Sequence, residues 1–258
     1  MAKIKKEERL ATGISGFDKL TQGGFISDSL NLIIGNAGAG KTTFLLQFLY
    51  NGAAKYNEKG LYVSFESNKQ NIYRNGLSLG MDFEELEKKG KCMILEFNPD
   101  ESIKSLQEKL MRIVIENDIQ RVGIDPLNVF SLNLPKEVSL RRQLYDFLSF
   151  IKNLNVCVLV AGESDEEFFG GGHKIADEIK FSKYLVDSVI ELFSAGIGGE
   201  GDRALRISKM RMTNHFRGPV AFKITGKGIS VSGNNSSKNT KSFVSGNTEK
   251  LVRKILSK

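Results

Sequence analysis

The stretch IIGNAGAGKTT (residues 33–43) sets three glycines and a lysine between an apolar run and a segment with helical spacing. From Gly35 it reads Gly-x-x-x-x-Gly-Lys-Thr, which is the spacing of a phosphate-binding loop. Residues 30–34 before it are a short apolar run rich in β-formers, and residues 41–56 carry apolar side chains at helical intervals. The stretch therefore predicts a strand, a phosphate-binding loop and a helix, in that order.

The chemistry of this loop follows from its residue types. Glycines allow backbone N–H groups to turn inward, and these donors, together with the helix N-terminus, favour a polyphosphate. We expect Lys41 to reach the β- and γ-phosphates and the Thr42 hydroxyl to ligate Mg²⁺. The residues expected around the phosphates are Gly35, Asn36, Ala37, Gly38, Ala39, Gly40, Lys41, Thr42 and Thr43. A glycine-rich turn without a ligand is the alternative, but every fixed position of the pattern matches.

The composition is that of an ordinary soluble globular protein, with 258 residues, 40% of them hydrophobic and 26% charged. No apolar segment approaches the length of a membrane span, and residues 1–10, MAKIKKEERL, lack the apolar core of a signal peptide. We therefore expect a cytoplasmic protein. Cys92 and Cys157 fall in expected strands, which suits buried reduced thiols. His173 and His215 are too few and too far apart to indicate a metal cluster.

The net charge of +7 is concentrated at the two ends of the chain. Residues 1–10 carry +2 and residues 232–258 carry +5, so the body between them is neutral. A neutral body argues against a folded surface broadly adapted to nucleic acid. The tail is rich in Ser, Asn, Gly and Lys and is expected to be flexible. The basic tail is a candidate binding segment for a protein partner or, less favoured, for a nucleic acid.

Strand and helix segments alternate along most of the chain. Expected strands are residues 30–34, 60–65, 91–97, 120–125 and 155–163, and expected helices are residues 41–56, 68–80, 82–89, 101–117 and 138–154. This order predicts an α/β fold with a mostly parallel sheet between helices. From residue 184 onward the helices stop, and residues 202–213, 220–225 and 228–233 are expected as antiparallel hairpin strands. The simplest division is a basic arm (1–8), one nucleotide-binding domain (9–231) and a flexible basic tail (232–258).

Two acidic residues end strands that follow the loop. Asp125 closes the apolar run in RVGIDPLNVF and precedes a proline, which is where a phosphate-loop fold carries its metal-side acid. Glu66 lies near the end of LYVSFES (61–67), where a carboxylate is placed to polarise an attacking water. The alternatives are a loop residue for Asp125 and a solvated strand-end carboxylate for Glu66.

A glycine-rich segment, residues 162–181 (GESDEEFFGGGHKIADEIKF), follows the fifth expected strand. Its acidic start repels phosphate, so we expect a flexible linker rather than a loop that contacts DNA. Phe168 and Phe169 are interpreted as buried in the core or an interface rather than as a stacking platform for bases.

Several stretches together carry a family resemblance. They are RLATGISGFDKLTQGGF (9–25), the loop GNAGAGKTT, the strand end YVSFE, the GID that ends at Asp125, and KMRMTNHFRGPVAFKITGKGISV (209–231). In order and spacing they resemble the KaiC-like ATPases, a ring-forming group related to RecA and RadA. The resemblance covers residues 9–231. It implies a RecA-like fold, ATP and Mg²⁺ as cofactors, ATP hydrolysis, and a ring, expected as a hexamer, with nucleotide between subunits.

The resemblance also implies roles for single residues. Lys209 and Arg211 match positions that reach the neighbouring subunit's triphosphate as cationic fingers. The residues matched to nucleotide contacts on that same face are Met210, Thr213 and His215. Ser78 matches a position near the nucleotide on the subunit that carries the loop. The alternation of side chains alone allows another interpretation of Lys209 and Arg211, as basic residues on the outer face of an amphipathic strand.

The chain departs from the family pattern in two ways that bear on function. Ser67 follows Glu66 where the family commonly has a second glutamate, which bears on the rate of hydrolysis. There is one ATPase domain, whereas the circadian-clock protein has two in tandem, so a clock role does not follow. Three functions stay open: a regulatory or signalling ring ATPase, a RadA-like recombination accessory that binds single-stranded DNA, and a nucleotide-gated scaffold with little hydrolysis.

Overall fold

The computed structural model describes residues 8–98, 101–127, 140–164, 177–194 and 202–232. Within them nine strands form one mixed sheet in the order β11-β10-β9-β8-β3-β7-β6-β4-β5, and β1 pairs with β2. The strands are β1 (Arg9–Leu10), β2 (Phe25–Ile26), β3 (Leu30–Gly35), β4 (Gly60–Ser64), β5 (Cys92–Glu96), β6 (Arg121–Asp125), β7 (Cys157–Glu163), β8 (Ser188–Ser194), β9 (Arg203–Met210), β10 (Val220–Thr225) and β11 (Gly228–Val231).

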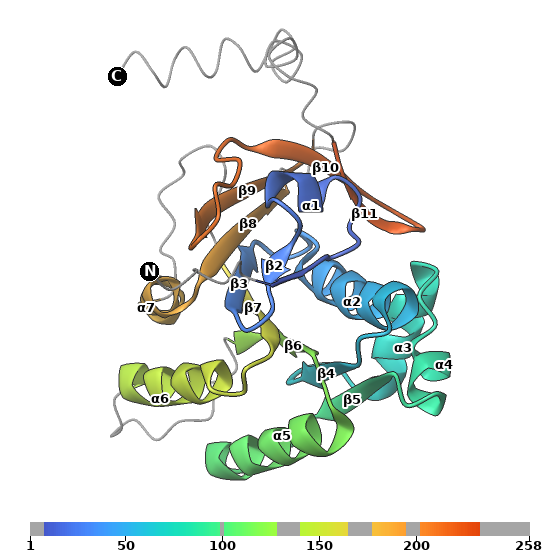
Figure 1. Ribbon diagram of the computed structural model, residues 1–258, viewed down its shortest axis with the longest axis vertical. Coiled ribbons are helices and arrows are strands. Elements are labelled where there is room, and N and C mark those ends of the chain that lie inside the picture. Colours follow the sequence, from blue (N-terminus) through green and yellow to red (C-terminus); the bar gives the residue numbers. More distant parts are fainter. Residues whose placement is uncertain (1–7, 99–100, 128–139, 165–176, 195–201, 233–258) are drawn as a thin grey trace, which may run out of the picture.

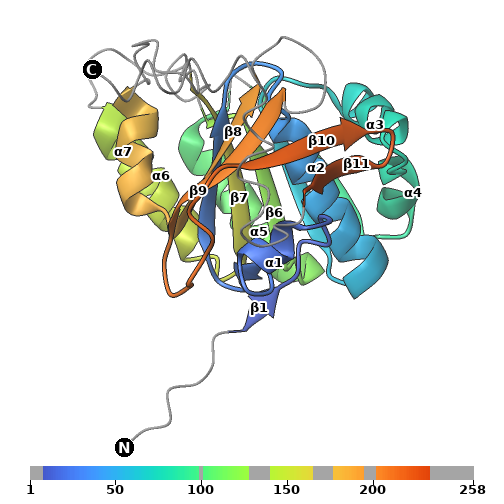
Figure 2. The same ribbon diagram turned by 90° about the horizontal axis from the view of Figure 1, so that it is seen from above.

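The helices cover both faces of this sheet (Figure 1). They are α1 (Phe17–Leu20), α2 (Lys41–Asn51), the π-helix η1 (Gly52–Tyr56), α3 (Lys69–Ser78), α4 (Phe83–Lys88), α5 (Ile103–Asn117), α6 (Leu140–Lys152) and α7 (Asp177–Leu185). Figure 2 shows the sheet edge-on between α6 and α7 on one side and α2, α3 and α4 on the other.

Six strands, β8, β3, β7, β6, β4 and β5, pair in parallel, and β9, β10 and β11 add antiparallel strands at one edge. The predicted architecture, a mostly parallel sheet flanked by helices with antiparallel C-terminal strands, is confirmed. The carboxyl ends of β3, β4, β6 and β7 therefore meet at one edge of the sheet, where α/β folds place ligands.

Two hydrophobic cores fill the layers on either side of the sheet. One holds Phe44, Leu45 and Phe48 of α2, and the other holds Phe147 and Ile151 of α6. Every residue of β3 is buried, as expected for a parallel strand covered on both faces. The central strand that leads into the loop is thus enclosed along its whole length.

Side-chain caps set the starts of three predicted helices. Asn68, Asp82 and Ser102 are the N-cap residues of α3, α4 and α5, and each side chain accepts a hydrogen bond from the backbone N–H three residues on. These residues favour caps because a short side-chain oxygen satisfies a helix N–H group that has no partner within the helix. The helices accordingly begin one or two residues later than the apolar spacing alone predicts.

Two of the differences from the sequence prediction concern where helices begin and end. The predicted helix 41–56 is α-helical only to Asn51 and continues as η1, and residues 177–181, predicted as part of a flexible linker, begin α7. The linker prediction is wrong there because Ile179 is fully buried against β7, with its Cδ1 only 2.5 Å from where a Cβ on Gly162 would lie. Residues 165–176, including Phe168, Phe169 and His173, lie outside the described residues.

Other predictions concern the cysteines and the two ends of the chain. Cys92 and Cys157 are free and buried, as predicted. No helix in the described ranges is long and apolar enough to cross a membrane. Residues 1–7 of the arm and 233–258 of the tail lie outside the described residues, so the domain limits 9–231 stay a prediction.

Candidate functional site

The predicted phosphate loop joins the end of β3 to the start of α2. Gly38 and Gly40 take positive φ angles of 73° and 106°, a conformation that glycine adopts without strain. Gly40 is also the N-cap of α2 and offers no side-chain cap to the first helical N–H groups. The loop therefore presents the backbone and the helix N-terminus that favour a polyphosphate.

Lys41 lies inside this loop rather than in solvent. Its side chain is 8% exposed, and Nζ donates hydrogen bonds to the carbonyl oxygens of Gly35 at 2.9 Å and Asn36 at 3.0 Å. Its Nζ also lies 3.8 Å from a carboxylate oxygen of Glu163. Burial lowers the pKa of Lys41, and the carboxylates of Glu163 and Asp125 oppose that shift. These contacts hold the Lys41 amino group within the loop.

Thr42 and Asp125 meet directly, as expected for a metal-side pair. Thr42 Oγ1 donates to Asp125 Oδ2 at 2.6 Å, and the Tyr62 hydroxyl donates to the same oxygen at 2.7 Å. Burial, and then the charge of Asp125, raise the pKa of Tyr62, so its hydroxyl stays a donor. A hydroxyl and a carboxylate are hard oxygen ligands that fit Mg²⁺, which completes its shell with water and phosphate oxygens. Within the described residues, no cluster of three or more His, Cys, Asp or Glu side chains offers another metal site.

Glu66 lies two residues past the end of β4, at the same edge of the sheet. It is exposed, and it interacts electrostatically with Glu163, Asp125 and Lys41. Loss of hydration raises the pKa of Glu66, the carboxylates of Glu163 and Asp125 raise it further, and Lys41 lowers it. The structure therefore gathers Lys41 and three acidic side chains around the loop.

Glu163, Tyr62 and Arg203 are site residues that the sequence analysis did not select. Glu163 ends β7, which pairs in register with β3 so that Glu163 lies opposite Gly35. Arg203 begins β9 and donates from NH1 to the carbonyl oxygen of Gly38 at 2.5 Å. For Glu163 a usable signal existed, because it ends an expected strand just as Glu66 and Asp125 do.

The predicted finger residues lie at the other end of the sheet from the loop. Lys209 pairs with Val189 at the start of β8, and Met210 pairs with Ser188, whereas Gly35 lies opposite Leu192. Through Asp187, Arg211 is level with Leu30, about 17 Å from Gly35 along β3. Lys209 is level with Leu32, about 10 Å from Gly35 along the strand, and its side chain bonds to residues 183–186. Neither Lys209 nor Arg211 is in reach of its own chain's loop.

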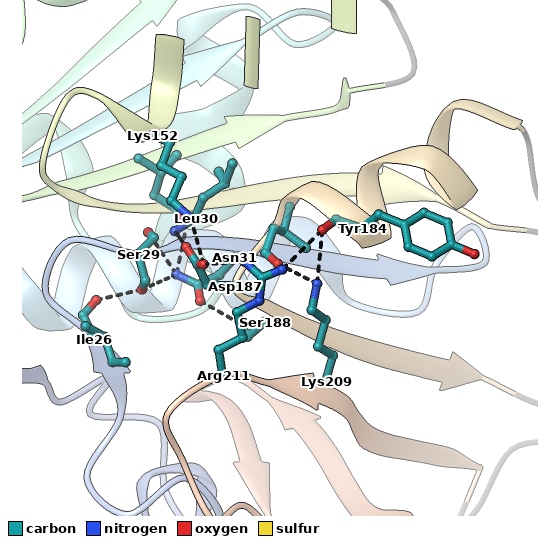
Figure 3. A network of polar contacts seen from close by, with 12 residues as sticks. Ile26, Ser29, Leu30, Asn31, Lys152, Tyr184, Asp187, Ser188, Lys209 and Arg211 are labelled. Atoms are coloured by element: carbon teal, nitrogen blue, oxygen red, sulfur yellow. Dashed lines mark hydrogen bonds and ion pairs between the residues drawn. The ribbon is translucent and has the colours of Figure 1, made fainter. Parts of the chain in front are cut away.

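Both cations contact the C-terminus of α7 instead (Figure 3). Lys209 Nζ donates to the carbonyl oxygens of Lys183 at 2.8 Å, Val186 at 2.7 Å and Tyr184 at 3.3 Å. Arg211 NH2 lies 3.5 Å from the same Tyr184 oxygen. A cation at this position satisfies terminal helix carbonyls and complements the helix dipole.

The remaining predicted nucleotide contacts form hydrogen bonds with residues outside the loop. Arg9 donates to the hydroxyl of Thr213 at 2.9 Å, and His215 Nδ1 lies 3.3 Å from the Thr213 carbonyl oxygen. Ser78 is the last residue of α3 and donates to the carbonyl oxygen of Asn75 at 2.8 Å. In the described part of the chain no hydrogen bond joins Ser78 to the loop.

The fold and the loop geometry together define a RecA-like protein of the P-loop nucleotide-binding class. The family model described as "ATPase: KaiC" matches residues 10–236, and the chain belongs to that family.

Relatives and a solved structure agree with this assignment. The circadian clock oscillator protein KaiC of Synechococcus elongatus is 30% identical over 232 residues, covering 86% of this chain and 44% of that protein. Its counterpart in Parathermosynechococcus lividus is 29% identical over 240 residues, covering 90% and 43%. The crystal structure of a KaiC-like protein from Pyrococcus horikoshii OT3 matches with a TM-score of 0.76 and 31% identity, over 88% of this chain and 100% of that chain. The chain spans less than half the length of these curated relatives.

Proposed function

We propose that this chain hydrolyses ATP in sites that form between neighbouring copies of itself in a ring, expected as a hexamer. Lys41 and the loop backbone hold the triphosphate, Thr42 and Asp125 hold Mg²⁺, and Glu66 orients the attacking water. Arg211 and Lys209 act from the neighbouring copy. A Mg²⁺ ion held by Thr42 and Asp125 would supply positive charge that offsets the negative charge developing during transfer.

One observation carries this proposal. The chain has a phosphate loop at one end of β3, whereas Arg211 is level with the other end and Lys209 with the middle of the strand, and both side chains bond to residues 183–187 and not to that loop. Phosphoryl transfer is accelerated mainly by positioning and by cations near the transferring group. A head-to-tail ring brings one end of each copy against the opposite end of the next, which would complete every site.

The two finger residues contribute differently. The side chain of Arg211 is 48% exposed, which leaves part of its guanidinium open to a neighbour. Lys209 donates to three carbonyl oxygens of its own chain. Burial lowers the pKa of Lys209, and the adjacent Arg211 lowers it further. We therefore assign Arg211 the larger share of transition-state stabilisation.

The biological role that we propose is regulatory or signalling, in the cytoplasm, with the basic tail available to a protein partner. Two features of the sequence lead to the two alternative functions. Ser67 follows Glu66 in the sequence, so hydrolysis slow enough for a scaffold is one outcome. The tail carries a charge of +5, so a recombination accessory that binds single-stranded DNA is the other outcome.

The experiment is ATP turnover of the purified chain, with and without single-stranded DNA, beside its mass in solution with and without ATP. We expect turnover and an ATP-stabilised oligomer, both lost in Lys41→Ala because the loop loses its triphosphate-directed cation. An active monomer would refute the composite site. Binding without turnover would establish the scaffold, and turnover that requires DNA would establish the recombination accessory.

A further inference from the structure

Asp187 connects the predicted finger to the central strand of the sheet. It lies between the end of α7 and the start of β8, and its side chain is only 10% exposed. Its Oδ2 accepts a hydrogen bond from the backbone N–H of Leu30 at 3.1 Å. Its Oδ1 accepts from Lys152 Nζ at 2.9 Å and from Arg211 NH1 at 3.3 Å. Figure 3 shows this carboxylate between the two cations.

The backbone of Asp187 is held as firmly as its side chain. Its N–H donates to the carbonyl oxygen of Leu30 at 2.7 Å, and its own carbonyl oxygen accepts from the N–H of Arg211 at 3.0 Å. Leu30 begins β3, the strand whose other end is the phosphate loop. Arg211 is therefore tied through both its backbone and its side chain to a residue that is itself fixed to the strand beneath the loop.

A β-bulge lies in β9 just before Lys209 and Arg211, the predicted finger residues. The pairing of β8 with β9 shifts between Val189, which pairs with Lys209, and Ile190, which pairs with Ile207, so Ser208 is an extra residue. Bulges re-aim the side chains that follow them. The backbone contact between Asp187 and Arg211 fixes the chain again three residues past Ser208.

We propose that Asp187 is a positioning residue that aims the Arg211 guanidinium toward the neighbouring copy. The inference rests on the proposed composite site and adds a residue to it. Asp187 touches no nucleotide in this arrangement and acts through Arg211. Its buried carboxylate accepts from NH1 at one edge of the guanidinium, so the exposed remainder is presented in one orientation. Such preorganisation matters most at the transition state, because a small misplacement of a catalytic group costs much of its effect.

The test is a double-mutant cycle on turnover. Asp187→Asn keeps the shape and can still accept from Leu30, but it loses the charge that holds Arg211. We expect its kcat to fall about tenfold with KM within about twofold and direct MgATP binding unchanged. In an Arg211→Ala background the same substitution should cost nothing further, because it acts only through Arg211. A purely structural residue would cost the same in both backgrounds, and that result would overturn the proposal.

Lys152→Met provides the matched control. It removes the other cation bound to Asp187 Oδ1 and keeps an apolar stem, so Arg211 retains its carboxylate. Turnover of this variant should stay within about twofold of wild type. A loss as large as that of Asp187→Asn would show that the charge cluster, and not the aim of Arg211, is what matters, and the proposal would fall.

Folding is checked by circular dichroism and by thermal unfolding of each variant. If Asp187→Asn does not fold, Asp187→Glu takes its place in the cycle, since it keeps the charge and moves the carboxylate by about 1.5 Å. Wild-type turnover in that variant would overturn the proposal. The failures are distinguishable: unimpaired turnover in Arg211→Ala refutes the composite site itself, whereas an impaired Arg211→Ala beside a normal Asp187→Asn refutes only the positioning role.

Discussion

The Thr42 hydroxyl donates to Asp125 Oδ2 at 2.6 Å although 83 positions separate the two residues. Thr42 lies in the first turn of α2, and Asp125 ends β6, which is joined to β3 through β7. The sheet order therefore builds an oxygen-lined corner beside the loop. A hydroxyl and a carboxylate at this separation are suited to share one Mg²⁺, directly or through its waters.

Thr42→Ala should weaken binding of MgATP by about tenfold and leave binding of metal-free ATP nearly unchanged, because the hydroxyl serves the metal. Titration calorimetry with and without Mg²⁺ measures both affinities. Tyr62→Phe is the control, since it removes the other hydrogen bond to the same Asp125 oxygen but no proposed metal ligand. An equal loss in both variants would assign the effect to the hydrogen-bond network instead of the metal.

Glu66→Gln should lower turnover at least about tenfold, or roughly 1.4 kcal/mol in the barrier, with MgATP binding retained. The amide keeps the size of the side chain but loses the charge that orients water. Single-turnover and binding measurements separate the two effects. Glu163→Gln is the comparison, because Glu163 also carries a carboxylate beside Lys41. A larger loss in Glu163→Gln would move the role of base to that residue.

The pH profile of kcat/KM reports titration in the free enzyme, where the pKa of Glu66 is raised by loss of hydration and then by Glu163 and Asp125. A raised pKa means that Glu66 gains its proton at a higher pH than usual. The acid limb of the profile should therefore lie above about pH 4.3, the ordinary value for glutamate. In Glu163→Gln that limb should move to lower pH, since one repelling charge is gone. A limb that does not move would argue against Glu66 as the titrating base.

The loop and its two acidic partners were predictable from the sequence because each depends on a local pattern. Gly35 to Thr42 have fixed spacing, and Asp125 and Glu66 end apolar runs, so their places follow from strand direction alone. Their closeness follows as well, since the carboxyl ends of parallel strands share one edge.

Contacts that depend on strand order and on tertiary packing were not predictable in this way. Glu163 reaches Lys41 because β7 lies directly beside β3, and Arg203 reaches the loop because β9 runs back along β8. The start of α7 was missed because its burial comes from Ile179 packing on β7, which no local period reveals. The contact of Lys209 with α7 has the same origin.

Deletion of residues 233–258 tests whether the tail binds nucleic acid. The tail carries +5, and each phosphate contact releases counterions, so deletion should weaken binding of single-stranded DNA and flatten its salt dependence. Fluorescence anisotropy of a labelled oligonucleotide at several salt concentrations measures both. We expect weak binding at physiological salt even with the tail. Tight, ATP-stimulated binding that survives deletion would favour the recombination accessory.

Arg211→Ala should lower turnover more than it lowers ATP affinity, because a cation from the neighbour is worth most when charge builds on the transferring group. Mixing the Arg211→Ala variant with the Lys41→Ala variant tests whether Arg211 acts on the site of a neighbouring copy. An Arg211→Ala copy retains an intact phosphate loop, and a Lys41→Ala copy retains Arg211. Mixed rings therefore contain some sites with both parts. Turnover of the mixture should exceed the sum for the two impaired variants alone, measured as turnover against mixing ratio, with co-assembly verified by differently tagged copies. If co-assembled rings show no such gain, Arg211 acts within its own chain or not at all. The separation of Arg211 from its own loop along β3 favours recovery.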